Sequence, residues 1–374
     1  MRASLRVGVV GGSIAGLSVA VALRRLGADV VVLERGAVEP ASRGGGLGVS
    51  LGLCRALARA PGDVPRHIVH QRRRLWIQGA EHEEPADIAV TSYSILWRWL
   101  REQLPASVLE FGQSVVLIDS KAGRPRVTTS DARARSFDLV VAADGGASDA
   151  RRHVLGEGAQ ATFAGYVLWR GLVSSSALDD PTGCLGSALH IANRGDHHFV
   201  SYAVPGGDAS SAFMNWGWYM PTDESALAAL LLEGAVKSPH QLERSEAADR
   251  VFERARAAAS VSWPAWAAQI IESTVAQGSI APHPVHEFAA STMTRERVVL
   301  VGDAAHLASP ISGSGGRLAM EDALTLADAL AGHDDLNEAL ASFSRSRSCA
   351  GAAIVEEGRR RGAAFRASSS TRTT

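Results

Sequence analysis

The sequence is poor in cysteine and carries almost no net charge. Its three cysteines, Cys54, Cys184 and Cys349, lie far apart and without Cys-x-x-Cys or Cys/His spacing. This argues against a zinc site and against a disulfide framework. We therefore expect no metal site and a reducing, cytoplasmic location. With 38 Lys and Arg against 39 Asp and Glu, the chain shows no electrostatic footprint for nucleic acid or for an anionic membrane.

Long hydrophobic runs are also missing. The early apolar run at residues 7–10 is interrupted by glycines at once. No later run approaches the roughly 18 apolar residues of a membrane helix, so we expect neither a signal peptide nor a membrane span. In contrast, 374 residues of which 46% are hydrophobic and 21% charged are typical of a folded protein with two or three domain-sized units.

The first 33 residues predict a strand, a helix and a second strand. Residues 5–10 and 29–33 are short apolar segments rich in β-branched residues, which is typical of buried strands. The helix expected between them, over residues 14–26, has apolar residues on two sides, so we expect it to pack against a sheet. Such a strand-helix-strand unit builds a parallel sheet.

The turn between this strand and helix has the composition of a dinucleotide-binding turn. Gly11, Ser13 and Gly16 are small, which lets backbone amides approach a pyrophosphate at the positive end of the helix. Glu34 ends the second strand 18 residues after Gly16, close to the offset of an acid that binds a ribose. Ser13 replaces the usual middle glycine, and its hydroxyl can reach a phosphate. The alternative is a tight turn without a ligand.

The middle third predicts an antiparallel sheet, because residues 166–173, 197–204 and 211–219 alternate or are rich in aromatics. Alternation in the last segment places Asn215 and Tyr219 on one face and Trp216 and Trp218 on the other, and either face is able to meet a ligand. We expect further helices at 94–104, 227–232, 247–259 and 319–330, and further strands at 75–78, 114–120, 126–130, 137–142 and 298–301.

Two later motifs separate flavin from nicotinamide binding. Asp144-Gly145 follows a predicted strand and precedes Arg151, and Gly302-Asp303 opens a segment that continues to Glu321-Asp322. With the first turn, these three motifs occur in the order found in the single-component (class A) FAD-dependent aromatic hydroxylases of the para-hydroxybenzoate hydroxylase type, which the chain resembles. Residues 165–171 and 215–219 are similar to the 2,6-dihydroxypyridine 3-hydroxylase subgroup, and the third motif is similar to FAD-dependent urate hydroxylases.

The resemblance implies an α/β fold in which a Rossmann-like FAD-binding domain is interleaved with an antiparallel-sheet substrate domain and followed by C-terminal helices. The FAD-binding domain is expected over 1–67, 91–160 and 279–345, and the substrate domain over 68–90 and 161–278. Residues 346–374 are expected to form a helix and a disordered tail.

The resemblance also implies which residues bind FAD. Glu34 would bind the adenosine ribose, Val116 would contact adenine through its backbone, and Asp303 would accept from the ribityl or pyrophosphate region. The full expected set is Gly11, Ser13, Ile14, Ala15, Gly16, Glu34, Arg35, Arg43, Arg98, Val116, Asp144, Asp303, Pro310, Gly313, Ser314, Gly315, Gly316 and Arg317. For Arg43 and Arg98, the alternative is a place on the surface.

Ser314 and Arg317 depart from the family pattern, in which many relatives carry Gln and Asn. A cation in the first turn of a helix opposes the helix dipole unless it meets an anion. Arg317 is therefore expected to face flavin, substrate or a carboxylate, with an arginine turned toward solvent as the alternative.

The implied activity is that of a monooxygenase. NADH or NADPH reduces FAD, O2 adds to give a C4a-hydroperoxyflavin, and one oxygen atom passes to a small electron-rich aromatic or N-heteroaromatic ring. The flavin carries the chemistry, and no particular side chain is assigned as catalytic, although the protein is expected to exclude water and to help deprotonate the ring hydroxyl. Alternatives are epoxidation, decarboxylative hydroxylation or ring opening on the same fold, and a flavin-binding protein without turnover. We expect a monomer or homodimer, and the candidate substrate contacts are His198, Tyr202, Asn215, Tyr219, His283 and Pro310.

Overall fold

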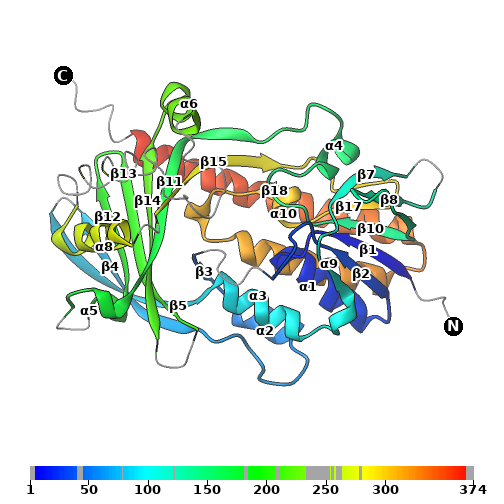
Figure 1. The fold of residues 1–374 in the computed structure, drawn as a ribbon, viewed down its shortest axis with the longest axis horizontal. Helices are drawn as coiled ribbons and strands as arrows, with labels where there is room; N and C mark the ends of the chain where they lie inside the picture. Colours follow the sequence, from blue (N-terminus) through cyan, green and yellow to red (C-terminus); the bar gives the residue numbers. More distant parts are fainter. Residues whose placement is uncertain are drawn as a thin grey trace.

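The computed structural model describes residues 5–39, 45–77, 79–120, 123–180, 184–207, 211–232, 253, 257, 263–277 and 280–367. Within these ranges the chain forms two large sheets, with helices packed beside and beneath them (Figure 1). A third sheet is small and antiparallel, with the order β7 (Val115–Asp119), β8 (Arg126–Thr129) and β9 (Ala134–Ser136). The predicted α/β class is confirmed.

The six-stranded sheet contains the predicted strand-helix-strand unit. Its central strands run parallel, with Val9 in register with both Val32 and Val141. Val7 and Val9 on one face of β1 and Val10 on the other are all buried, so this strand has no face open to solvent. The strand order is β16 (Thr294–Arg295), β17 (Val298–Leu300), β10 (Leu139–Ala142), β1 (Arg6–Val10), β2 (Asp29–Leu33) and β6 (Leu109–Glu110).

The nine-stranded sheet contains the expected antiparallel strands and several that the pattern did not predict. Its order is β18 (His306–Leu307), β15 (Ala281–Ala289), β11 (Thr162–Ser174), β14 (Ala212–Pro221), β13 (His197–Pro205), β12 (Leu189–Arg194), β4 (Ile68–Ile77), β5 (Ala80–Ser92) and β3 (Gly46–Gly48). Strands β3, β15 and β18 thus pair within this sheet, although residues 46–48, 281–289 and 306–307 lie in segments assigned to the FAD-binding domain. The exact domain limits stay a prediction.

Strand β5 lacked a sequence signal because charge, rather than apolar alternation, pairs it with β4. Arg73 forms an ion pair with Glu84 at 2.6 Å, and Arg74 pairs with Glu83 at 3.0 Å. Directly opposite charges stabilise an antiparallel pair. The expected strand at 75–78 is therefore the end of a much longer hairpin.

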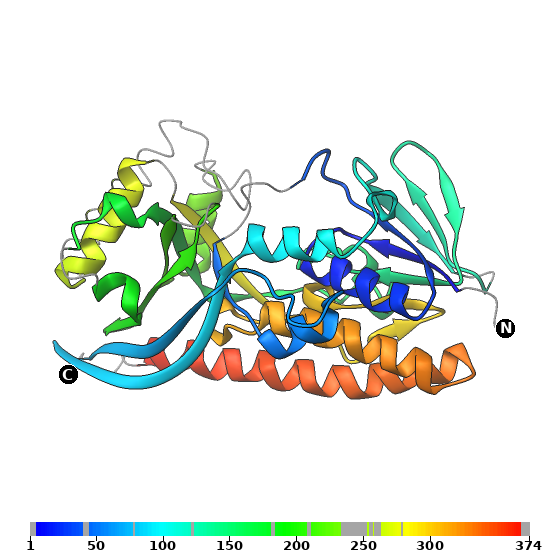
Figure 2. The same cartoon turned by 90° about the horizontal axis from the view of Figure 1, so that it is seen from below.

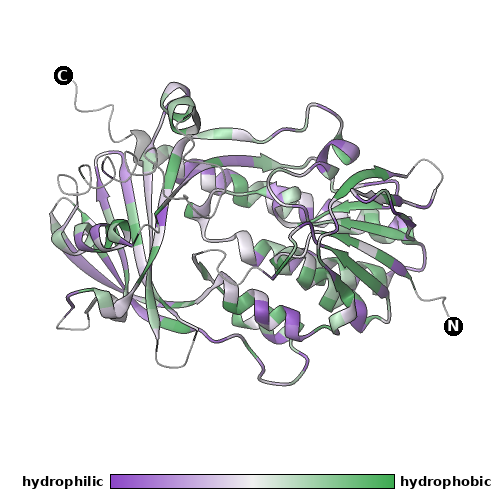
Figure 3. Ribbon diagram, viewed as in Figure 1, coloured by the Kyte–Doolittle hydropathy of each residue, from purple (hydrophilic) through white to green (hydrophobic). Residues whose placement is uncertain are grey.

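The two faces of the nine-stranded sheet have different environments. Trp216 donates from Nε1 to Thr274 Oγ1 on α8 (Ala265–Ala276) at 2.9 Å, so its face is covered by a helix. On the opposite face, Asn215 Oδ1 accepts from the Gly46 amide at 2.6 Å. The Asn215 face therefore contacts the start of β3, the segment that follows β2 of the six-stranded sheet in the chain. Figure 3 shows polar and apolar residues mixed along the strands of the large sheet, while the central strands of the six-stranded sheet are uniformly apolar.

Helices α9 (Gly315–Gly332) and α10 (Leu336–Ala367) join the two sheets from below, and α10 runs along nearly the whole molecule (Figure 2). Small residues let α10 approach closely: a Cβ on Gly351 would lie 2.2 Å from His306 Nδ1. Because α10 begins at Leu336, it crosses the expected boundary at 346. Within the described ranges, the other α-helices are α1 (Ile14–Arg25), α2 (Leu51–Leu57), α3 (Tyr93–Glu102), α4 (Ala150–Leu155), α5 (Cys184–Ser187) and α6 (Glu224–Leu232).

Some expectations fall outside the described residues. The helix expected at 247–259 is described only at 253 and 257, and the tail beyond 367 is not described. Across the described ranges, no helix is both long enough and apolar enough to cross a membrane. Over the same ranges, no group of His, Cys, Asp and Glu side chains is arranged to hold a metal ion.

Candidate active site

A cavity of about 810 Å³ lies between the six-stranded sheet and strands β3 and β11 of the nine-stranded sheet. Its walls are the ends of β1 and β2, the starts of α1, α3 and α9, helix α4, strands β3 and β7, and Arg170 of β11. The predicted cofactor residues on its wall are Gly11, Ser13, Ile14, Ala15, Glu34, Arg35, Val116, Asp144, Asp303, Gly315 and Gly316. Those that lie elsewhere are Gly16, Arg98, Pro310, Gly313, Ser314 and Arg317, and Arg43 lies outside the described residues.

The glycine turn brings backbone to the cavity because side chains have no room there. Gly11 has φ +99°, and a Cβ on it would lie 2.4 Å from the Ala143 carbonyl oxygen. A Cβ on Gly16 would lie 1.9 Å from the Gly11 carbonyl oxygen, so Gly16 closes the turn rather than lining the cavity. Trp97, which the motif did not include, donates from Nε1 to the Gly12 carbonyl at 2.7 Å.

The start of α1 faces the cavity without a side-chain cap. Ser13 is the N-cap residue, but its hydroxyl lies 2.8 Å from Tyr93 Oη instead of accepting from a helix amide. The first amides of a helix attract an anion through their N–H groups and the helix dipole. This part of the wall fits a pyrophosphate.

Glu34 lies at the cavity edge, where it also holds the backbone. Its Oε2 accepts from the Gly12 amide at 2.7 Å, and its Oε1 accepts from the Gly36 amide at 2.7 Å. A carboxylate has about four acceptor positions, so these two bonds leave acceptors for ribose hydroxyls. Glu34 therefore combines a structural role with the predicted ribose contact.

Val116 lies in an irregularity of the small sheet. Val115 and Leu117 pair with successive residues Thr129 and Thr128, so Val116 between them has no partner in the register. A bulge of this kind frees backbone groups from the ladder. Val116 is 63% exposed and lines the cavity, which fits the predicted backbone contact to adenine.

The second and third motifs are held together by Arg151. Its guanidinium donates from Nε to the Ala304 carbonyl at 2.9 Å and from Nη2 to the Asp303 carbonyl at 2.8 Å. It also lies 4.1 Å from the centre of the Phe288 ring. Arg151 thereby fixes the 3₁₀ turn Gly302–Ala304, from which the Asp303 side chain opens into the cavity.

Two carboxylates in this wall suit a ligand that donates hydrogen bonds. Asp144 Oδ1 is buried without a hydrogen-bond partner among the described residues, and burial raises the pKa of Asp144. Asp303 contacts the space of the cavity, but the surrounding protein removes bulk water, and this desolvation raises its pKa as well. Hydroxyl donors of a bound sugar or ribityl chain would satisfy both groups.

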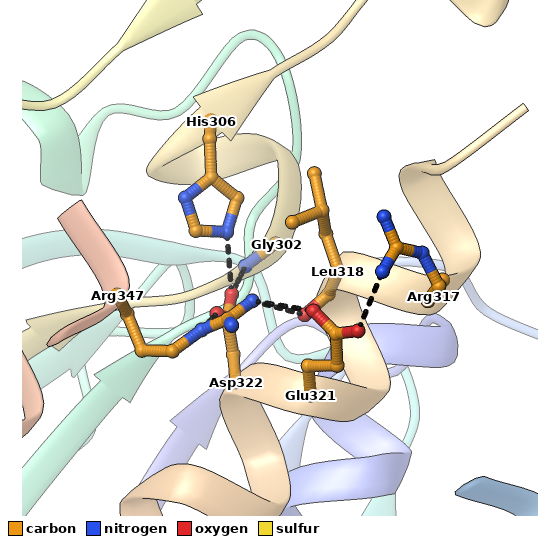
Figure 4. Close-up of polar contacts among 7 residues, drawn as sticks. All are labelled: Gly302, His306, Arg317, Leu318, Glu321, Asp322 and Arg347. Carbon is orange, nitrogen blue, oxygen red and sulfur yellow. Dashed lines mark hydrogen bonds and ion pairs between the residues drawn. The ribbon is translucent and has the colours of Figure 1, made fainter. Parts of the chain in front are cut away.

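Behind this wall lies a buried network that the motifs only partly indicated (Figure 4). Asp322 accepts from the Gly302 amide, from His306 Nε2 and from Arg347 Nε, each at 2.7 Å. Glu321 accepts from Arg347 at 3.1 Å and from Arg317 at 2.9 Å. Arg317 therefore meets a carboxylate, one of the three partners left open by the sequence, and its side chain is 45% exposed.

None of the six candidate substrate residues lies on the cavity wall, although most share the sheet face of Arg170. Tyr219 pairs directly with Leu168 and His198, and Tyr202 pairs with Asn215. His198 Nδ1 lies 2.6 Å from Asn193 Oδ1, and burial lowers the pKa of His198 to about 4.

The remaining candidates are divided between this face and an adjacent turn. His283 follows on β15 opposite Leu168, and the exposed Pro310 begins a 3₁₀ turn. Arg170, which lines the cavity from β11, belongs to the segment at 165–171 but is not among the residues predicted from sequence.

The fold and the cavity define an FAD-binding oxidoreductase, and comparison with known proteins makes the assignment specific. The chain belongs to the family described as FAD binding domain, whose model matches residues 4–357. A 2,6-dihydroxypyridine 3-monooxygenase of Paenarthrobacter nicotinovorans is 27% identical over 90% of this chain and 86% of the relative. An FAD-dependent urate hydroxylase of Mycolicibacterium vanbaalenii is 28% identical over 96% of this chain and 88% of the relative.

Solved structures agree with this fold. The 2,6-dihydroxypyridine-3-hydroxylase of Arthrobacter nicotinovorans superposes with a TM-score of 0.86 at 25% identity, covering 97% of this chain and 93% of that one. Klebsiella pneumoniae HpxO, solved with FAD and uric acid, gives a TM-score of 0.80 at 23% identity, covering 97% and 89%. The chain is thus a flavin-dependent monooxygenase with FAD as its cofactor, and the resemblance stated from sequence is confirmed.

Proposed function

We propose that this protein hydroxylates a small, electron-rich aromatic or N-heteroaromatic compound, using O2 and NADH or NADPH. One observation carries the proposal: a single cavity extends from the dinucleotide-binding turn at Gly11 to Arg170 on the tyrosine-bearing face of the large sheet. The relatives named for dihydroxypyridine and urate oxidation support an N-heteroaromatic ring.

The residues of the cavity suit FAD. The α1 start would hold the pyrophosphate, Glu34 the adenosine ribose, and Asp144 and Asp303 the hydroxyl-bearing chain. When bound, FAD supplies electron transfer and oxygen activation. The amides at the start of α9, where Gly315 and Gly316 line the cavity, would stabilise negative charge on the reduced ring.

The large sheet would provide the substrate side. Tyr202 and Tyr219 lie on the Arg170 face, and burial raises the pKa of both phenols well above the ordinary value. They therefore remain neutral and able to donate hydrogen bonds at pH 7. Their rings and the surrounding apolar side chains exclude water, which a hydroxylase requires if its oxidising equivalents are to reach the substrate.

Sparse cysteines and balanced charge support a cytoplasmic protein that acts without nucleic acid. We propose a monomer or homodimer with a small aromatic substrate as its partner.

The test is turnover by the purified, FAD-loaded protein. We expect NADH or NADPH oxidation to accelerate with 2,6-dihydroxypyridine, urate or a related hydroxylated ring, and a product that contains one oxygen atom from ¹⁸O2. Product mass separates hydroxylation from decarboxylative hydroxylation, and product structure separates it from epoxidation and ring opening. NAD(P)H oxidation that no aromatic compound stimulates would refute the proposal and favour a flavin-binding protein without turnover.

A further inference from the structure

Arg170 is a largely buried cation without a protein counter-charge. It lies in the middle of β11, opposite Gly217 of β14, and it lines the cavity. Desolvation lowers its pKa, yet an arginine stays protonated at neutral pH. Across the described parts of the chain, its guanidinium forms no hydrogen bond or ion pair with another residue.

The nearest polar groups do not neutralise this charge. The electrostatic partners of Arg170 are Tyr202 and Tyr219, both on the same sheet face. Because burial raises the pKa of both phenols, the two tyrosines are neutral donors at pH 7 rather than phenolates. Neutral phenols can accept hydrogen bonds, but they supply no negative charge to the buried cation.

Such an arrangement favours a particular ligand. An unpaired buried charge destabilises the folded state, so a folded protein gains when a ligand supplies the opposite charge. The guanidinium is a planar fork that donates two parallel hydrogen bonds. Its best partner is a planar anion with two acceptor atoms side by side.

We propose that Arg170 is the positioning residue for the substrate and that it selects a planar anion. Two sources share this chemistry: a carboxylate on the ring, or the deprotonated O–C–N edge of a hydroxylated N-heteroaromatic ring. Tyr202 and Tyr219 lie on the same sheet face, off the cavity wall, and supply no negative charge that would compete with the ligand for Arg170. The inference rests on the proposed function, because it assumes that an aromatic substrate enters this cavity.

The test compares Arg170→Met and Arg170→Lys with Arg194→Met, an exposed arginine of β12 in the same sheet. Binding to the FAD-loaded protein is followed through the flavin absorbance spectrum. The probes are 2,6-dihydroxypyridine and urate for the heteroaromatic source, 3-amino-4-hydroxybenzoate for the carboxylate source, and phenol as the uncharged ring. FAD affinity and the thermal unfolding temperature of the FAD-free protein are measured for every variant.

For the anionic probes that the parent protein binds, we expect Arg170→Met to lower the affinity roughly 10- to 100-fold, since charge-assisted hydrogen bonds are lost. Arg170→Lys should retain part of the affinity, because it keeps the charge but loses the fork. Phenol binding, FAD affinity and every property of Arg194→Met should match the parent. The unfolding temperature of Arg170→Met should stay level or rise, because an unpaired buried charge has been removed.

The proposal is overturned if Arg170→Met binds the anions as the parent does, if it loses FAD affinity instead, or if its unfolding temperature falls. It is also overturned if the parent binds phenol but none of the anions, or binds no probe. The proposed function fails separately, when an anion binds in an Arg170-dependent way but stimulates no NAD(P)H oxidation.

Discussion

The carboxylate of Asp322 accepts a hydrogen bond from the Gly302 amide at 2.7 Å and so ties α9 to the turn that carries Asp303. The same carboxylate accepts from Arg347 of α10, also at 2.7 Å. Asp322 is fully buried. Because Asp322 does not line the cavity, it supports the cavity wall from behind, and its removal should affect folding and cofactor affinity together.

Asp322→Asn should destabilise the protein by roughly 3–5 kcal/mol, because it leaves the Arg347 cation buried without its main partner. FAD affinity should fall as well, since the Gly302 turn loses its anchor. Urea unfolding and FAD titration measure the two effects. Asp328→Asn, an exposed substitution on the same helix, is the control. An Asp322→Asn protein with parent stability would show that the network is dispensable.

Glu34→Ala should weaken FAD binding by roughly 1.5–3 kcal/mol through loss of a charge-assisted hydrogen bond. Because Glu34 also accepts from the Gly12 and Gly36 amides, part of this loss comes from the turn itself. Glu34→Gln separates the two roles, since it keeps an acceptor but removes the charge. Titration of the FAD-free protein gives both affinities, with the exposed Glu102→Gln as control. If Glu34→Ala binds FAD as tightly as the parent protein does, Glu34 does not contact the cofactor.

Local sequence patterns predicted the parts of the site that neighbouring residues build. The turn at Gly11 and the acid at Glu34 belong to one strand-helix-strand unit, so their spacing in the sequence is enough to predict that they lie close together. The Asp322 network could not be found this way, because Gly302, Asp322 and Arg347 come together only when α10 packs beneath α9. Arg170 was missed for a related reason: a single arginine in an apolar strand acquires meaning only when the cavity and its tyrosine neighbours are known.

Arg317→Ala tests the residue that departs most from the family pattern. Its guanidinium binds Glu321 one turn along α9 and remains 45% exposed, and such a pair contributes only about 0.3–0.5 kcal/mol. We expect unchanged FAD affinity and a change in unfolding free energy below about 0.5 kcal/mol. Arg347→Ala, which empties the buried side of the same network, should be far more damaging. A loss of flavin affinity or a shifted flavin potential in Arg317→Ala would instead show that Arg317 reaches the cofactor.

Asp303→Asn should lower the affinity for FAD and raise the stability of the FAD-free protein. Desolvation by the surrounding cavity wall raises the pKa of Asp303 above the ordinary value of 3.8, so the folded protein binds the proton more tightly than the unfolded chain. The free energy of unfolding of the FAD-free protein then falls as pH rises above 3.8 through the folded-state pKa. The asparagine removes this loss, so the FAD-free variant should be more stable than the parent at pH 7 and less sensitive to pH.

The same substitution should weaken FAD binding, because an amide oxygen accepts hydrogen bonds from hydroxyl groups less strongly than a carboxylate does. Thermal unfolding from pH 4 to pH 8, without and with saturating FAD, measures both effects on one preparation, and Asp328→Asn is again the control. If the variant has a higher unfolding temperature than the parent without FAD and a smaller increase in that temperature with FAD, the Asp303 carboxylate binds the cofactor and destabilises the FAD-free fold. If Asp303→Asn is instead less stable without FAD and gains the full shift with it, the Asp303 carboxylate supports the fold and does not contact the cofactor.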